Sequence, residues 1–205
     1  MRTLIAIPCL DMMHTSFVIS LTGMRMKGET KLVYSVSSLV YDSRNGLARR
    51  AIVENFDRVL WLDSDMEFNA DLFQRLSDDL DEGRDFVSAL CTTRKYPIKP
   101  CVFKRCGYEH IGDGVKPIAE TYYDYPKDSV FECEATGLAA VMMNTSLLKE
   151  VEEKYGLPFS PMLGFGEDLA FCLRVKDLGK KVYCDSRIKV GHIGYKTFGE
   201  DDLNG

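Results

Sequence analysis

Two aspartates separated by one serine, Asp63 and Asp65, end an apolar run in the segment FDRVLWLDSDMEF, residues 56 to 68. The residues RVLWL are typical of a buried strand, so both carboxylates stand where that strand ends. In open parallel sheets, ligands bind beyond the carboxyl ends of the strands. Two adjacent carboxylates repel each other unless a cation joins them. The motif therefore indicates a site for Mg²⁺ or Mn²⁺, ions that bind one or two carboxylates together with substrate phosphates.

The same motif allows other interpretations. As a purely structural feature, the aspartates would cap the turn before a helix that starts at Asn69. An EF-hand calcium loop is excluded, because Phe68 stands where the loop needs glycine and Gln74 where it needs glutamate. A phosphatase of the haloacid dehalogenase type also has its nucleophilic aspartate after an apolar strand. That family has Thr or Val where this chain has Glu67, and here the motif lies far from the first strand.

A second acidic pair, Glu167 and Asp168, is expected in the first turn of a helix, where the helix dipole stabilises anions. Helix capping needs only one such residue, and the nearby Gly164 and Gly166 indicate close approach by a ligand. His192 follows a strand and lies between glycines, which makes it a candidate nitrogen ligand for Mn²⁺. The alternative for each is structural: helix-end stabilisation for the acids and a satisfied core histidine for His192.

Strand-like and helix-like segments alternate through residues 1 to 91, and this alternation must position the acidic motif. The expected strands are TLIAIP, ended by Pro8, then KLVYSV, RVLWL and DFVSAL; helices are expected over 14–26, around 47–52 and over 69–83. Continuous apolar strands alternating with helices predict a mainly parallel sheet flanked by helices on both faces.

The pattern changes after Cys91. Residues 92–130 are expected to form variable loops and short strands that lie over one edge of the sheet on the acceptor side. They carry a basic island, defined as Arg94, Lys95, Lys99, Lys104 and Arg105, and several tyrosines. The island is either a solvated face or a site for a phosphate-bearing or nucleic-acid acceptor. Beyond it we expect one strand over 129–143, a helix capped by Asn144, a helix over 169–178 ended by Gly179, two last strands, and a flexible tail at 196–205.

Composition limits the classes of protein. The chain has 205 residues with 45% hydrophobic residues, which fits a single domain over 1–205 with a full core. A net charge of −5 excludes a broad basic face for duplex nucleic acid. Seven cysteines without C-x-x-C spacing favour a reducing, cytoplasmic setting. Pro8 and Asp11 come too early for a signal peptide, and the sequence contains no apolar run long enough for a membrane span.

Four blocks in order give the chain a family resemblance: IAIPC, SRNGLARRAI at 43–52, WLDSDMEF, and the block that runs from GED to VGHIG. The sequence resembles nucleotide-sugar-dependent glycosyltransferases of the GT-A fold, near the broad family 2 group and its histidine-containing relatives. The resemblance covers most of the chain outside 92–130. It implies a Rossmann-like α/β domain that transfers a hexose from a nucleotide sugar, most often a UDP-sugar, with Mn²⁺ or Mg²⁺ as cofactor.

The resemblance also implies roles for single residues. Asp65 and His192 would bind the metal, with Asp63 closer to the ribose of the donor. Asp168, with Glu167 beside it, would act on the acceptor, as the base if the reaction inverts the sugar's configuration. The implied donor-binding set is Pro8, Cys9, Leu10, Arg44, Asn45, Arg49, Asp63, Ser64 and Asp65, and the implied acceptor-side glycines are Gly137 and Gly166. Gly137 has an alternative role in close backbone packing.

Overall fold

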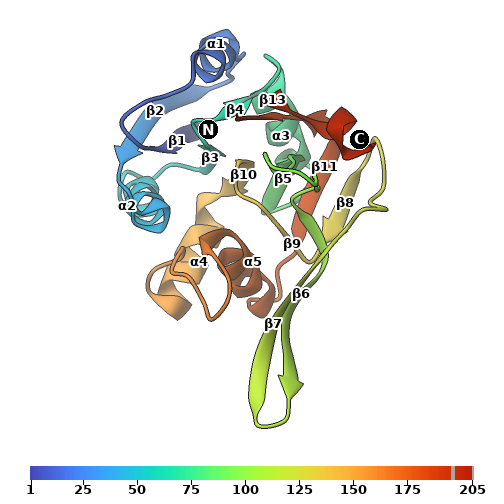
Figure 1. The fold of residues 1–205 in the computed structure, drawn as a ribbon. Helices are drawn as coiled ribbons and strands as arrows, with labels where there is room; N and C mark the ends of the chain where they lie inside the picture. Colours follow the sequence, from blue (N-terminus) through green and yellow to red (C-terminus); the bar gives the residue numbers. More distant parts are fainter. Residues whose placement is uncertain (195–196, 205) are drawn as a thin grey trace.

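The computed structural model describes residues 1–194 and 197–204. Within them, seven strands form a central sheet in the order β2-β1-β3-β10-β5-β11-β8 (Figure 1). The strands of this sheet are β1 (Arg2–Cys9), β2 (Glu29–Val36), β3 (Arg58–Leu62), β5 (Phe86–Leu90), β8 (Val130–Cys133), β10 (Ala140–Asn144) and β11 (Val182–Lys189). From the pairings, β10 and β8 run opposite to the other five strands. The predicted mainly parallel sheet is therefore confirmed.

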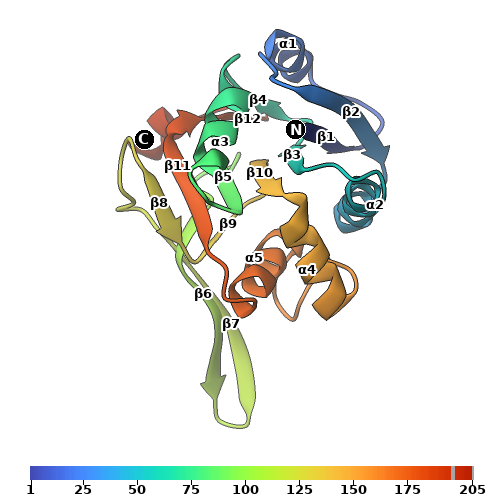
Figure 2. The same ribbon diagram turned by 180° about the vertical axis from the view of Figure 1, so that it is seen from behind.

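Helices cover both faces of the sheet, as the alternation predicted. One face packs against α2 (Val40–Val53), α4 (Thr145–Tyr155) and α5 (Glu167–Asp177). The other packs against α1 (Thr15–Gly23) and α3 (Leu72–Asp81). Alternate residues of each strand enter opposite cores: on β3, Trp61 faces α2 and Leu62 faces α1 and α3. Figure 2, seen from behind, shows α3 lying across the second face.

Two smaller sheets extend the domain within the described residues. β12 (Gly191–Ile193) lies between β13 (Thr197–Phe198) and β4 (Met66–Glu67), the short strand that follows the acidic motif. β6 (Val102–Ile111) and β7 (Gly114–Thr121) form a hairpin that projects away from the body (Figures 1 and 2), and β6 also pairs with β9 (Ala135–Thr136). The first of these sheets connects the C-terminal region with the end of β3.

Several predicted boundaries differ from the structure. The first strand does not end at Pro8 but continues to Cys9. Because β3 pairs only with Thr3–Ala6, the missing amide hydrogen of Pro8 leaves no hydrogen bond to β3 unmade. The third helix starts two residues later than predicted, with Asp71 rather than Asn69 before its first turn. The run over 129–143 is three strands, β8, β9 and β10, in two sheets. Its pattern of apolar residues does not reveal where the chain changes its pairing partner.

The second half is more ordered than predicted. Residues 92–130 contain the long β6–β7 hairpin rather than loops and short strands. In the expected tail, residues 197–204 form β13 and a 3₁₀ helix, η1 (Glu200–Asn204), whereas 196 and 205 lie outside the described residues. Glu200 accepts hydrogen bonds from Tyr125 and Lys127, so this part is tied to the body.

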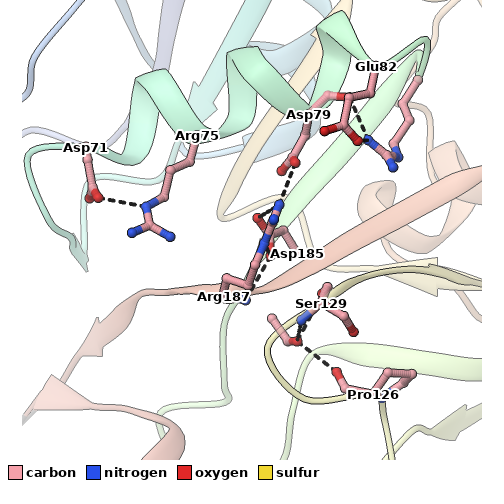
Figure 3. A network of polar contacts seen from close by, with 10 residues as sticks. Asp71, Arg75, Asp79, Glu82, Pro126, Ser129, Asp185 and Arg187 are labelled. Atoms are coloured by element: carbon pink, nitrogen blue, oxygen red, sulfur yellow. Dashed lines mark hydrogen bonds and ion pairs between the residues drawn. The ribbon is translucent and has the colours of Figure 1, made fainter.

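A polar network anchors α3 to β11 under the second face (Figure 3). The guanidinium of Arg187 donates to Asp79 of α3 at 2.7 Å and to Asp185 of β11 at 2.8 Å. Both aspartates are buried. Burial and then the adjacent Asp185 carboxylate raise the pKa of Asp79 to about 7. This network joins α3 to β11 near the carboxyl end of β11 and has a structural role.

All seven cysteines lie in the described part of the chain, and each is a free thiol. None of the helices described here is long and apolar enough to cross a bilayer.

Candidate active site

A cavity of about 240 Å³ opens where the carboxyl ends of β1, β2 and β3 meet. Since these strands are parallel, their following loops converge on one edge of the sheet. Six of the nine predicted donor-binding residues line it: Pro8, Cys9, Leu10, Asp63, Ser64 and Asp65. The rest of its lining comes from Ser37 and Ser38 of the β2–α2 connection and from Val40 and Ser43 at the start of α2. The structure thus gathers the acidic motif and the end of β1 in one concave site.

The inner half of the site consists of Arg44, Asp63 and Glu167. The Arg44 guanidinium on α2 donates to Asp63 Oδ1 at 2.7 Å and to Glu167 Oε1 at 3.3 Å, and lies over the Trp61 ring. Its side chain is only 2% exposed. The resemblance implied that Arg44 faces the nucleotide; in the structure its buried guanidinium holds together two acids from distant parts of the chain.

Asp63 is held in a costly environment for a negative charge. Burial raises the pKa of its carboxyl above the ordinary value, and the adjacent Asp65 and Glu167 carboxylates act in the same direction. The Arg44 guanidinium opposes this rise without cancelling it. Asp63 is thus fixed in position by one buried cation, which suits a hydrogen-bonding role better than that of a freely exchanging ligand.

The outer half of the site consists of Asp65, His192 and Arg94. β12 pairs antiparallel with β4, which places His192 opposite Met66 and next to Asp65. The Ile193 amide also donates to the Asp65 carbonyl at 2.7 Å. As a result, His192 Nε2 lies 3.3 Å from Asp65 Oδ2, although 127 positions separate the two residues. This juxtaposition is the one that the candidate metal site required.

The imidazole of His192 is oriented for ligation. Its Nδ1 lies 2.8 Å from the carbonyl oxygen of Thr92, which can only accept, so Nδ1 carries the hydrogen. A neutral ring then directs the Nε2 lone pair toward the Asp65 carboxylate, and two electron-pair donors face each other. A proton or a metal cation between them relieves that repulsion. A backbone carbonyl on the second ring nitrogen is also the usual support of a metal-binding histidine.

The charges of this pair respond to each other. Burial disfavours the charged form of each group, but the contact between them outweighs it. The pKa of the Asp65 carboxyl is lowered by the hydrogen bond and charge of His192, with a further contribution from Arg94. The pKa of His192 is raised by Asp65 and by the Thr92 carbonyl. Asp65 is therefore a carboxylate at neutral pH.

Within residues 1–194 and 197–204, three or more His, Cys, Asp or Glu side chains do not gather in a group that could hold a metal ion. A divalent cation at Asp65 and His192 would therefore need most of its ligands from a substrate and water. Mg²⁺ commonly binds in this way, through one or two carboxylates and substrate phosphates. The two protein ligands fit such an ion with water in the remaining positions, and a phosphate-bearing ligand would strengthen its binding.

Asp168 lies in the first turn of α5, and its helix is preceded by Gly166. A Cβ at Gly166 would lie 3.2 Å from Asp168 Oδ1, so the glycine leaves room for this carboxylate. Burial raises the pKa of Asp168, although the Leu169 amide, at 2.7 Å from Oδ1, acts in the opposite direction. The helix terminus alone predicts a weaker base, whereas the observed environment makes Asp168 a stronger one.

Other predicted residues lie elsewhere. Asn45 is buried, and its Oδ1 accepts the Phe159 amide at 2.9 Å, so it holds the loop before α5. Arg49 is exposed and pairs with Glu152 on α4. A Cβ at Gly137 would lie 3.4 Å from Cys101 Cβ, which agrees with the packing interpretation of this glycine. The basic island is dispersed: Lys104 pairs with Glu120 and Arg105 with Glu109, on the hairpin.

Sequence reasoning missed Ser37, Ser38, Thr92 and Cys101, and placed Arg94 only in the basic island. The first three follow the carboxyl ends of β2 and β5, so the strand-end rule that found Asp63 would also have found them. The pKa of the Cys101 thiol is lowered by its contact with Cys91, and charges at His192 and Asp168 also act on it, so this thiol lies near the site. Only tertiary structure reveals that position.

Comparisons with known proteins give a fold but no sequence family. No protein-family model and no curated protein matches the chain. Among solved structures, A197 from STIV matches with a TM-score of 0.65 and 18% identity, over 95% of this chain and 86% of that one. Two structures of S. aureus TarS, one of residues 1–349, match with TM-scores of 0.54 and 0.53 and identities of 14% and 13%, over 91% and 90% of this chain. This chain spans 58% and 35% of those two TarS chains.

These likenesses agree with the predicted architecture, a mainly parallel sheet between two helical layers. The molecule has the GT-A fold.

Proposed function

We propose that this protein is a metal-dependent glycosyltransferase that uses a nucleotide sugar, with a UDP-sugar as the donor. The observation that carries the proposal is the convergence of Asp65 and His192, 3.3 Å apart, at a cavity lined by the ends of β1, β2 and β3. The GT-A fold and a half-buried acid on α5, Asp168, support it.

The chain's own residues divide the work. Pro8, Cys9 and Leu10 form one wall of the nucleotide cavity, and Ser64 lies at its edge. Asp63, fixed by Arg44, accepts hydrogen bonds from the donor ribose. Asp65 and His192 would hold Mn²⁺ or Mg²⁺, which supplies positive charge to the leaving diphosphate.

Asp168 accepts the proton of the acceptor hydroxyl. The acceptor oxygen forms a bond to the anomeric carbon as the bond between that carbon and the diphosphate oxygen breaks, so the diphosphate leaves with the electron pair. A raised pKa improves Asp168 for this role, because proton transfer from a hydroxyl is easier to a more basic carboxylate. This mechanism inverts the configuration of the sugar, and an NMR assignment of the product anomer checks it.

The phosphoryl-transfer alternative uses Asp63 as a nucleophile. Arg44 holds Oδ1 of that residue at 2.7 Å. This contact restrains the oxygen that would attack phosphorus, which supports sugar transfer over phosphoryl transfer.

The test is to incubate the protein with UDP-sugars and Mn²⁺ and to measure UDP release. A parallel reaction measures phosphate release from a generic phosphate ester. Wild-type protein should release UDP only with the metal, and Asp65→Ala should lose metal-dependent UDP binding in calorimetry. Asp71→Ala serves as the matched control, since it removes an acid that pairs with Arg75 away from the cavity.

Three results would contradict the proposal. Phosphate release from the ester would favour the phosphoryl-transfer enzyme. UDP binding without any turnover, even hydrolysis, would favour a non-catalytic sugar-nucleotide-binding module. Full-strength metal-dependent UDP binding by Asp65→Ala would show that the metal site is misplaced.

A further inference from the structure

Besides His192, Arg94 also contacts the carboxylate of Asp65. Arg94 Nη1 lies 2.5 Å from Asp65 Oδ2, the same oxygen that faces His192 Nε2. Asp65 is 23% exposed and Arg94 is 55% exposed, so this ion pair is at the rim of the cavity. Arg94 therefore provides the positive charge that the Asp65 carboxylate needs at that rim.

A metal ion cannot share this oxygen with Arg94 at the distances observed. An oxygen ligand lies about 2.0–2.1 Å from Mg²⁺, and a guanidinium in contact with the same oxygen would place two cations against each other. Arg94 must leave Asp65 Oδ2 for the metal to bind through that oxygen. Arginine and metal are therefore alternative partners of one carboxylate.

The surroundings allow Arg94 to move without unfolding. Its loop is closed at the base, where the Thr93 amide donates to the Lys99 carbonyl at 2.8 Å and the Lys99 amide donates to Thr93 Oγ1. Arg94 lies just beyond that closure and lines a cavity of about 380 Å³ with His14, Lys95 and Gly194. The guanidinium can turn by side-chain rotation into this space.

The chemistry of the displaced side chain suggests its next partner. A guanidinium binds phosphate oxygens through two parallel hydrogen bonds, better than an ammonium does. A diphosphate bound to a metal at Asp65 would lie within reach of the same side chain. Arg94 would then exchange a carboxylate partner for a phosphate partner.

We propose that Arg94 is an exchangeable cation of the donor site: it neutralises Asp65 until a divalent metal takes that carboxylate, and it then binds the diphosphate of the donor. This inference rests on the proposed function, because it requires a metal and a nucleotide diphosphate at Asp65. It makes metal and nucleotide binding cooperative, since each favours the position of Arg94 that the other needs.

The experiment measures Mn²⁺ affinity by isothermal titration calorimetry, with and without UDP, for wild type, Arg94→Met and Lys95→Met. Methionine keeps the length of the side chain, and its thioether is a poor ligand for this metal. Without UDP, Arg94→Met should bind Mn²⁺ more tightly than wild type, by about twofold to fivefold for the loss of one competing ion pair at a rim. With UDP present, the factor by which UDP strengthens Mn²⁺ binding should decrease by at least that amount.

Lys95→Met removes the same charge one position along and should change both values by less than twofold. An arginine that merely stabilised the loop would not give tighter metal binding when removed. The exchange of Arg94 is overturned if wild type and Arg94→Met bind Mn²⁺ equally, or if Arg94→Met and Lys95→Met change the Mn²⁺ affinity by the same factor. Neither result contradicts the metal site itself. Absence of Mn²⁺ binding in all three proteins, with UDP present, overturns the metal site and the exchange together. Metal-independent turnover that Arg94→Met abolishes would make Arg94 a permanent replacement for the metal and also overturns the exchange.

Discussion

The two aspartates of the D-S-D motif stand two positions apart and belong to different environments. Asp63, in the inner half, is paired with an arginine that is 2% exposed, and its pKa is raised. Asp65, in the outer half, faces His192 and an arginine that is 55% exposed, and its pKa is lowered. The inner half is held together by the buried guanidinium of Arg44. The outer half is assembled at a rim from three separate segments.

This difference indicates a division between a fixed and an exchangeable charge. A buried guanidinium that bridges two acids cannot leave at low cost, because both carboxylates would then lack the cation that compensates their charge. A rim arginine can leave at little cost because water and other partners replace the contact. The inner half thus sets geometry, and the outer half is suited to accept a ligand cation. Variants in the two halves should therefore differ in turnover, in UDP affinity and in the free energy of unfolding.

The largest effect is expected at the acceptor side, next to the inner half. Asp168→Asn keeps the shape of the side chain and removes its ability to take a proton, so the turnover rate should fall roughly a hundredfold to ten-thousandfold. UDP affinity should stay within twofold of wild type, because Asp168 does not line the nucleotide cavity. Steady-state kinetics and calorimetry measure the two quantities.

Glu167→Gln is the matched control for that variant, since Glu167 accepts from Arg44 rather than facing the acceptor. Its turnover should fall less than that of Asp168→Asn. If both variants lose turnover and UDP binding together, Asp168 acts through the structure of α5 and not as the base.

The next prediction compares the two arginines directly. Arg44→Met should lower the free energy of unfolding on the order of 3 kcal/mol, because Asp63 and Glu167 lose the cation between them. Arg94→Met should lower it by less than about 1 kcal/mol, as expected for a rim ion pair. Urea denaturation measures both. Similar losses in the two variants would remove the distinction between fixed and exchangeable halves.

Whether the sequence predicts a feature of these two halves depends on how far apart in the chain the contacting residues stand. The strand RVLWL and its terminal acids form a local pattern that can be read from the sequence. Apolar periodicity likewise predicts the first four strands of the central sheet, β1, β2, β3 and β5, and the helices between them, because it follows which residues are buried. The bridge from Arg44 to Glu167 spans 123 positions, and no local pattern specifies which charged residue a buried arginine will join. The resemblance named Arg44 but could not give its partner.

The second half of the chain shows the same limit for strands. β8 and β10 were merged because their apolar runs are nearly continuous, although β8 pairs with β11 and β10 lies between β3 and β5. The β6–β7 hairpin is not evident from the sequence because its strands are rich in charge and mostly exposed, so they lack a buried face to alternate against. His192 was placed correctly near Asp65 only through the family resemblance; its position follows from β12 pairing with β4, which no spacing rule predicts.

A second arginine between two acids provides an internal reference for the inner half. Arg187 bridges the buried Asp79 and Asp185 outside the lining of the donor cavity (Figure 3), and the pKa of Asp79 is raised to about 7. The ordinary value of 3.8 applies to the unfolded chain, so between about pH 4 and 7 the folded protein binds more protons. The stability from this proton is fully present below pH 4 and is lost as the pH rises to about 7.

The slope of the free energy of unfolding against pH should therefore contain a negative contribution from this proton between about pH 4 and 7. That contribution is up to about 1.4 kcal/mol per pH unit. Asp79→Asn should remove that contribution, and urea denaturation at pH 4.5, 5.5 and 6.5 measures it for both proteins. Asp78→Asn, on the adjacent exposed position of α3, is the control and should keep the wild-type slope. An unchanged slope in Asp79→Asn would mean that Asp79 is ionised throughout the range.

The smallest effect is expected at Arg49, which the family resemblance assigned to the donor. Arg49 lies on α2, five positions after Arg44, but its guanidinium is exposed and pairs with Glu152 of α4 at 3.1 Å. An exposed pair of this kind contributes less than about 1 kcal/mol to stability and nothing to a cavity that it does not line. Arg49→Ala should change UDP affinity by less than twofold, whereas Arg44→Met should weaken it because Asp63 loses its orientation. A loss of UDP affinity in Arg49→Ala that equals the loss in Arg44→Met would require α2 to shift toward the donor on binding, and the inner half would then not be fixed.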